Sequence, residues 1–129
     1  MNSKKAIEEF QAFIDFFPYN EKVPEAEKKI DELNEKLAHK AFESARIYEK
    51  LEYYTAAISY YDNVLEVYHD TPYASLAMYN KIKILVDRNR NKDALSEISK
   101  FIQRYPDNQR TPEIKELKSS LENKISAAR

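Results

Sequence analysis

Large apolar residues recur every three or four positions along almost the whole chain, and short polar segments with proline interrupt them. Such spacing is typical of amphipathic α-helices that bury one face. The first segment, residues 3–18, carries Ile7, Phe10 and Ile14 on one stripe and stops at Pro18. The pattern along the chain therefore predicts an all-α protein of about six helices.

The second segment is unusually long. Pro24 fits the first turn of a helix, where its missing N–H has no intrahelical acceptor to lose. Small or apolar residues then recur over residues 26–51 with no helix breaker. About 28 residues at about 1.5 Å each predict a rod of about 42 Å. Its first half has only a narrow stripe of Ile30, Leu33 and Leu37, which indicates a helix packed along a seam.

The same spacing predicts four shorter helices in the rest of the chain. A turn near residues 52–53 ends the long helix. Thr71 and Pro72 restart the chain after the next helix, and we predict Thr71 as N-cap and Pro72 as the first helical residue. The polar run 87–92 separates two more helices. The final segment, 111–127, has one apolar stripe and an otherwise polar surface, which is typical of a helix at the end of a stack.

Three segments of the chain superimpose without gaps. They begin at Ala6, Ala57 and Ala94, and in each a large aliphatic residue follows the alanine, with bulky residues four, seven and eight positions after it. A small residue lets a partner helix approach closely, and helical hairpins of this kind stack on their neighbours. We interpret residues 1–129 as one repeat domain: 3–18 as the second helix of a truncated repeat, 24–70 as a repeat with an extended first helix, 72–106 as a repeat, and 111–127 as a capping helix.

Missing residue types exclude most small-molecule chemistry. The chain has no glycine, which excludes phosphate loops and dinucleotide fingerprints, and no cysteine, which excludes disulfides and thiolate zinc sites. Its two histidines, His39 and His69, lie on different predicted elements, with His69 in a surface turn. The carboxylate pairs have no apolar surroundings that would raise a pKa for acid catalysis. We therefore predict no catalytic residues, no metal and no cofactor.

The charge balance argues against two kinds of partner. With 21 basic and 22 acidic residues the net charge is −1, so nothing draws the whole chain to nucleic acid or anionic lipid. No apolar run approaches the roughly 20 residues of a membrane span. We expect no nucleic-acid partner and no membrane insertion by this chain. A local basic stretch is interpreted as a solvated helix end; it comprises Lys81, Lys83, Arg88, Arg90 and Lys92.

One helix pair resembles the tetratricopeptide repeat, whose pattern places a tyrosine, a small residue, another aromatic and a proline on two helices. The matching positions are Tyr48, Ala57, Tyr61 and the turn at His69. The family's turn glycine is replaced by Glu52 in this unit and by Asn89 in the next. The resemblance implies stacked helical hairpins in a right-handed solenoid.

A longer succession of motifs is similar to the BamD family, the lipoprotein subunit of the bacterial outer-membrane β-barrel assembly machine. The motifs are an Ala-Ile-x-x-Phe helix ending at Phe17-Pro18, the charged helix 26–38, Phe42, Ala45–Tyr48, Tyr54–Ile58 and Asp70-Thr71-Pro72. The similarity runs from about Lys5 to about Leu121. It implies a C-terminal fragment of such a protein, with the signal and lipid-anchored cysteine upstream. It also implies a non-catalytic scaffold on the periplasmic face of the outer membrane, docked to other assembly subunits, in particular the periplasmic domains of the barrel subunit.

The candidate partner contacts follow from the repeat geometry, in which the first helix of each pair lines the concave side. Positions off the packing stripe are His39, Phe42, Arg46 and Glu49 in one unit, and Tyr79, Lys83 and Val86 in the next. The alternative is a cytoplasmic tetratricopeptide adaptor that binds a partner peptide or helix. The Lys/Asn/Arg clamp of chaperone-binding relatives is poorly matched, which disfavours an adaptor for chaperone tails.

Overall fold

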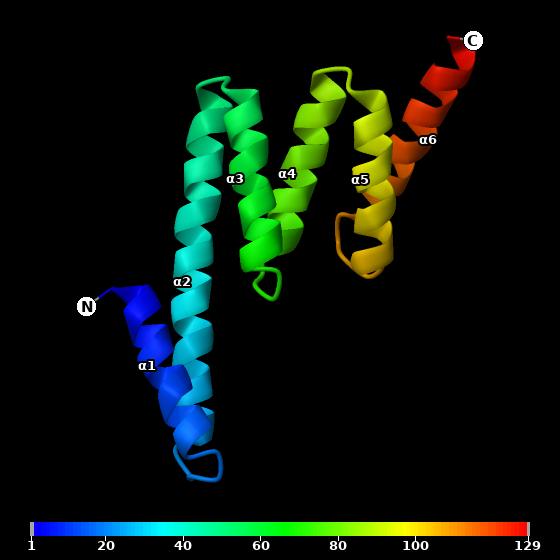
Figure 1. The fold of residues 1–129 in the computed structure, drawn as a ribbon. Coiled ribbons are helices and arrows are strands. Elements are labelled where there is room, and N and C mark those ends of the chain that lie inside the picture. Colours follow the sequence, from blue (N-terminus) through cyan, green and yellow to red (C-terminus); the bar gives the residue numbers. More distant parts are fainter. Residues whose placement is uncertain (1, 129) are drawn as a thin grey trace.

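The computed structural model describes residues 2–128 and consists in that range of six helices without a strand. The helices are α1 (Ser3–Phe16), α2 (Val23–Lys50), α3 (Tyr54–Val67), α4 (Tyr73–Asp87), α5 (Asn91–Arg104) and α6 (Thr111–Ala127). Each helix packs against the next one in the chain, and α2 also contacts α4. Figure 1 shows α2 to α5 side by side in an open row, with α6 at its end. The predicted all-α, tetratricopeptide-like fold is confirmed.

The long helix is present as one continuous element. Helix α2 has 28 residues, and Pro24 lies in its first turn. Helix α1 packs only on α2 within the described chain and buries no residue fully. In Figure 1, α1 lies along the N-terminal half of α2, whereas α3 lies along the C-terminal half. The α1–α2 hairpin therefore forms an arm that projects from the stack, with Phe16 and Tyr19 exposed near its end.

Two apolar clusters hold the stack together. The first joins α2, α3 and α4 around Phe42 and Tyr61, and the second joins α4, α5 and α6 around Ile98 and Phe101. Ala57 and Ala94, the small residues of the repeat motif, are both fully buried in these clusters. Their burial agrees with the predicted close approach of neighbouring helices at these positions.

Helices α2 and α4 are each followed, two residues after their last helical residue, by a residue with left-handed backbone conformation. Glu52 has a φ of 63° and Asn89 a φ of 59°. At the end of α2, the Tyr53 N–H donates to the Tyr48 carbonyl at 3.0 Å, and the corresponding bond closes the end of α4. This bond and the positive φ define the Schellman motif, in which the left-handed residue is usually glycine. The two replaced turn glycines therefore keep the backbone conformation that glycine favours.

Both Thr-Pro steps connect successive helices in a way that differs from the prediction for Thr71. The Thr71 hydroxyl donates to the Tyr68 carbonyl at 2.7 Å, and Pro72 takes the N-cap position of α4 without a side-chain cap. Thr111 is buried, and its hydroxyl donates to the Tyr105 carbonyl. The predicted N-cap role of Thr71 is wrong, because its hydroxyl instead satisfies a carbonyl left without an intrahelical donor at the end of the preceding helix.

Candidate functional site

The predicted contacts on α2 lie on the side of that helix that meets α4. His39 and Arg46 are exposed, and both approach Glu43, at 3.9 Å and 3.1 Å. The His39 ring also lies 5.3 Å from the ring of Tyr73, the first residue of α4. We name this the α2–α4 face, defined by His39, Glu43, Arg46 and Tyr73. It is a polar surface with one aromatic edge, and sequence reasoning did not include Glu43 or Tyr73.

A hydrogen-bonded network fixes Glu49 beside this face. The fully buried Tyr61 of α3 donates its hydroxyl proton to Glu49 Oε1 at 2.6 Å and accepts from Asn80 Nδ2 at 3.2 Å. Burial raises the pKa of Tyr61, and the hydrogen bond to Glu49 raises it further. The network thereby joins α2, α3 and α4, and one carboxylate oxygen of Glu49 is engaged within the chain.

Phe42 belongs to the core and offers almost no free surface. Only 7% of the residue is exposed, and its ring lies 5.8 Å from that of Tyr61 and 5.6 Å from that of Tyr73. The first turn of α4 brings Tyr73 against it. The structure therefore corrects the prediction of Phe42 as a partner contact, because helical spacing identifies a shared face but does not say which part of that face a later repeat covers.

The predicted contacts on α4 are partly covered by the end of the chain. The Tyr79 hydroxyl donates to Glu113 Oε1 at 3.0 Å, and the Arg110 guanidinium lies 4.8 Å from the Tyr79 ring centroid. Burial is the largest cause that raises the pKa of Tyr79, followed by its bond to Glu113. Val86 packs against the second apolar cluster, and Lys83 is half-buried. These contacts place Tyr79 and Val86 in internal packing around α6 and the second cluster.

A second surface, on the α2–α3 hairpin, was not predicted. Ile47 and Leu51 are each 56% exposed and lie one turn apart on α2, while Tyr53 is 61% exposed in the turn that follows. The rings of Tyr48 and Tyr60 stack with centroids 5.0 Å apart and 22° between their planes. The hydrogen-bond interaction between the Tyr48 and Tyr60 hydroxyls raises the pKa of Tyr48. We name these five residues the tyrosine patch.

The sequence did not reveal the tyrosine patch, because Tyr48 fits the repeat pattern and its spacing gives no sign that part of its ring lies at the surface. The tilted packing of Tyr53 on Tyr48, with ring centroids 6.5 Å apart, makes the aromatic surface continuous. The available signal was the pair Ile47 and Leu51, two large apolar residues one turn apart and beside that stripe. Exposed apolar surfaces are typical of interaction sites when they are large and continuous.

Lys81 departs from the prediction of a solvated basic helix end. Its side chain is only 13% exposed, and its Nζ lies 2.7 Å from Asp62 Oδ1 and 3.4 Å from Glu97 Oε1. These three residues, which we name the Lys81 bridge, connect α3, α4 and α5. The packing of three helices encloses Lys81, whereas Arg88 and Arg90 of the same basic stretch are exposed as predicted.

Two kinds of feature are absent from residues 2–128. No three His, Cys, Asp or Glu side chains gather as a metal site. None of the helices in this range has both the length and the apolar character that a membrane span requires.

The comparisons with known proteins identify the family. A family model described as YfiO, outer membrane lipoprotein, matches residues 1–90. The chain belongs to the YfiO family of outer membrane lipoproteins. This membership agrees with the resemblance to the BamD family, and the matched range includes the whole tyrosine patch and the α2–α4 face. No curated protein matches the chain.

Proposed function

We propose that this chain is a non-catalytic scaffold in the assembly of outer-membrane proteins, acting on the periplasmic face of the outer membrane. In this role it docks the periplasmic domains of the barrel subunit of the assembly machine. Membership of the YfiO family supports the setting. The observation that carries the docking role is the tyrosine patch, in which every residue except the half-buried Tyr48 is exposed.

The chemistry of the tyrosine patch suits a protein partner. A tyrosine buries a large apolar ring while its hydroxyl keeps a hydrogen bond, and tyrosines are enriched among the residues that dominate interface energies. The stacking of Tyr48 on Tyr60 restrains both rings before a partner arrives. Less side-chain freedom is then lost on binding, which favours affinity.

The α2–α4 face has a different character and supports a second role. His39 and Arg46 are exposed and polar, so contacts there would orient a partner more than they would bind it tightly. A tetratricopeptide adaptor that binds a peptide or helix would use this face instead of the tyrosine patch. The two candidate functions therefore predict different sensitive residues.

Binding of the purified periplasmic domains of the barrel subunit, measured by isothermal titration calorimetry, tests the proposal. Tyr60→Ala should weaken binding by about tenfold or more, the effect of losing an interface residue worth about 1.4 kcal/mol. Tyr19→Ala is the matched control, because Tyr19 is 99% exposed on the distant arm and should leave binding unchanged. Circular dichroism should show the same helicity for all variants.

Other outcomes would reject the proposal in distinguishable ways. Undiminished binding by Tyr60→Ala would remove the tyrosine patch from the interface. A loss confined to Arg46→Ala would move docking to the α2–α4 face and favour the adaptor. Failure of the unchanged chain to bind the barrel subunit would refute the proposed partner.

A further inference from the structure

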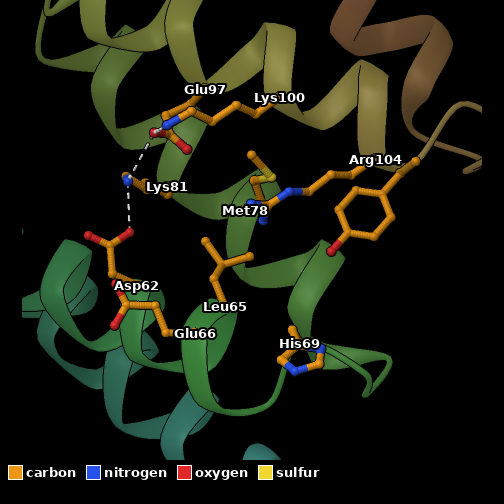
Figure 2. Close-up of a pocket in the computed structure, with 10 residues that line it drawn as sticks. Asp62, Leu65, Glu66, His69, Met78, Lys81, Glu97, Lys100 and Arg104 are labelled. Atoms are coloured by element: carbon orange, nitrogen blue, oxygen red, sulfur yellow. Dashed lines mark hydrogen bonds and ion pairs between the residues drawn. The ribbon is translucent and has the colours of Figure 1, made fainter.

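The Lys81 bridge contains all the ion pairs that connect different helices within residues 2–128. The Lys81 Nζ lies 2.7 Å from Asp62 Oδ1 on α3 and 3.4 Å from Glu97 Oε1 on α5, and Figure 2 shows it between the two carboxylates. Every other ion pair in this range joins residues three or four positions apart in the sequence. Charge pairing between helices is therefore concentrated at one lysine of α4.

The spacing of α3 and α5 is not fixed by direct packing of these two helices. In the described chain both helices pack on α4, and their backbones do not contact each other. Cavities of about 670 and 270 Å³ are both lined by the Lys81 bridge, so open space remains beside it. Ile58 and Leu65 of α3 pack at the margin of the second apolar cluster. Such apolar contacts are non-directional and permit packed helices to slide by small amounts.

The charges of the Lys81 bridge interact strongly because they are close together and largely enclosed. The Glu97 side chain is 14% exposed, almost the same as that of Lys81, so dissolved salt screens this pair only weakly. The two carboxylate oxygens lie no more than about 6 Å apart, the sum of their distances to the Lys81 ammonium. Partly buried like charges at this separation repel each other when no cation lies between them. Lys100 pairs with Glu97 within α5 and does not reach α3.

We propose that the Lys81 bridge sets the distance between α3 and α5 and thereby the curvature of the helix stack. With the Lys81 charge present, the carboxylates of the two helices are attracted to one ammonium. Without it they repel each other, and α3 and α5 move apart on α4. In a solenoid, small rotations between neighbouring repeats determine the shape of the binding surface. The bridge therefore fixes how the tyrosine patch is oriented relative to α5 and α6, which goes beyond the proposed docking function.

Double electron–electron resonance between spin labels on α3 and α5 tests this inference in the full chain. Because the sequence has no cysteine, Asn63→Cys and Ser99→Cys introduce two exposed labelling sites outside the Lys81 bridge. Lys81→Met removes the charge but keeps a long side chain, and it should lengthen the mean distance between the labels by about 2 Å or more. Lys81→Arg keeps the charge and should leave the distance unchanged.

Two controls isolate the link between α3 and α5. Lys100→Met removes a cation from the same Glu97 carboxylate without breaking a contact to α3, so it should not change the distance. A second label pair, Lys40→Cys with Asn63→Cys, measures the spacing of α2 and α3 and should give the same distance in every variant.

A double variant separates the effect of charge from that of side-chain shape. Adding Asp62→Asn to Lys81→Met removes the repulsion between the carboxylates, so the distance should be shorter than in Lys81→Met. Equal distances in these two variants, no lengthening by Lys81→Met, or equal lengthening by Lys100→Met would overturn the proposal.

A further variant keeps the test decisive if circular dichroism shows that Lys81→Met does not fold. Asp62→Asn alone removes the α3 end of the bridge, which is its more exposed end, and should lengthen the distance by a smaller amount. An unchanged distance in Asp62→Asn would also overturn the proposal. None of these measurements uses the barrel subunit, so their outcome is independent of the docking function.

Discussion

Glu52→Gly should stabilise the protein, because it places the residue that the turn favours where the backbone already requires it. Glu52 follows the last turn of α2 with a φ of 63°, and it is exposed and makes no ion pair in the described chain. The substitution therefore removes almost no contact of the folded state. What changes is the free energy of the left-handed conformation.

The expected gain is a difference of two opposing effects. A non-glycine residue in the left-handed region costs about 1–2 kcal/mol, and glycine removes this cost. Glycine also gives the unfolded chain more freedom, which opposes the gain by about 0.4–1 kcal/mol. The net stabilisation should be about 0.5–1 kcal/mol, or about 2–4 °C in Tm for a chain of this size. Asn89→Gly should gain less than half as much, because asparagine tolerates this conformation better than glutamate does.

Urea unfolding followed by circular dichroism measures the change as a shift in midpoint. Glu52→Ala is the matched control, since it removes the same charge but keeps the left-handed penalty. Lys50→Gly places a glycine at the last residue of α2, where the backbone is helical. It should therefore have the opposite effect and lower the free energy of unfolding by about 0.5–1 kcal/mol. If Glu52→Gly were no more stable than Glu52→Ala, the strain inferred from the backbone of this turn would be refuted.

The remaining predictions concern the buried contacts between helices. Ala57→Leu should overpack the first apolar cluster, in which Ala57 is fully buried, and lower the urea-derived stability by about 1–3 kcal/mol. The half-buried neighbour offers the control Ala56→Leu, which should change the stability by much less, and equal effects would contradict the assigned packing register. Thr111→Val keeps the shape of the side chain but leaves the Tyr105 carbonyl with only the Asn108 N–H as donor, at 3.2 Å. It should cost about 0.5–1.5 kcal/mol in the same assay, and an unchanged midpoint would count against the bond from Thr111. Because the pKa of Tyr61 is raised in the folded state, its contribution is complete below about pH 10 and is lost as the pH rises further. When the pH is raised from about 8 to about 11, the free energy of unfolding of Tyr61→Phe should therefore fall less than that of the unchanged chain. Equal decreases for the two proteins would show that ionisation of Tyr61 does not contribute.

Helix positions were largely predictable because they depend on local spacing. Pro24 opens a helix that needs no N–H at its first turn, and the uninterrupted apolar stripe after it predicted the long α2. The turns at Glu52 and Asn89 were also located correctly, since the replaced family glycines identified the helix ends. Thr71 was misassigned because a threonine hydroxyl can accept from the following helix or donate to the preceding one, and the sequence is the same in both cases.

The candidate site was predicted less completely because exposure depends on what the neighbouring helices cover. His39 and Arg46 are free at the surface, but Phe42 on the same stripe is enclosed by Tyr61 and Tyr73. Each of these contacts joins residues from different helices. No periodicity within a single helix could have distinguished the covered position from the free ones.

The amino-acid sequence by itself determined the helices, their order and the chemistry that this protein lacks, because hydrophobic spacing, prolines and missing residue types act locally or through composition alone. Only the tertiary structure decided which side chains remain available to a partner. Stacking buries Phe42, encloses Lys81 between two carboxylates and leaves Tyr60 at the surface. The physical reason is that burial and charge pairing arise from the approach of separate helices, which depends on packing along their whole length and not on any one residue's neighbours in the chain.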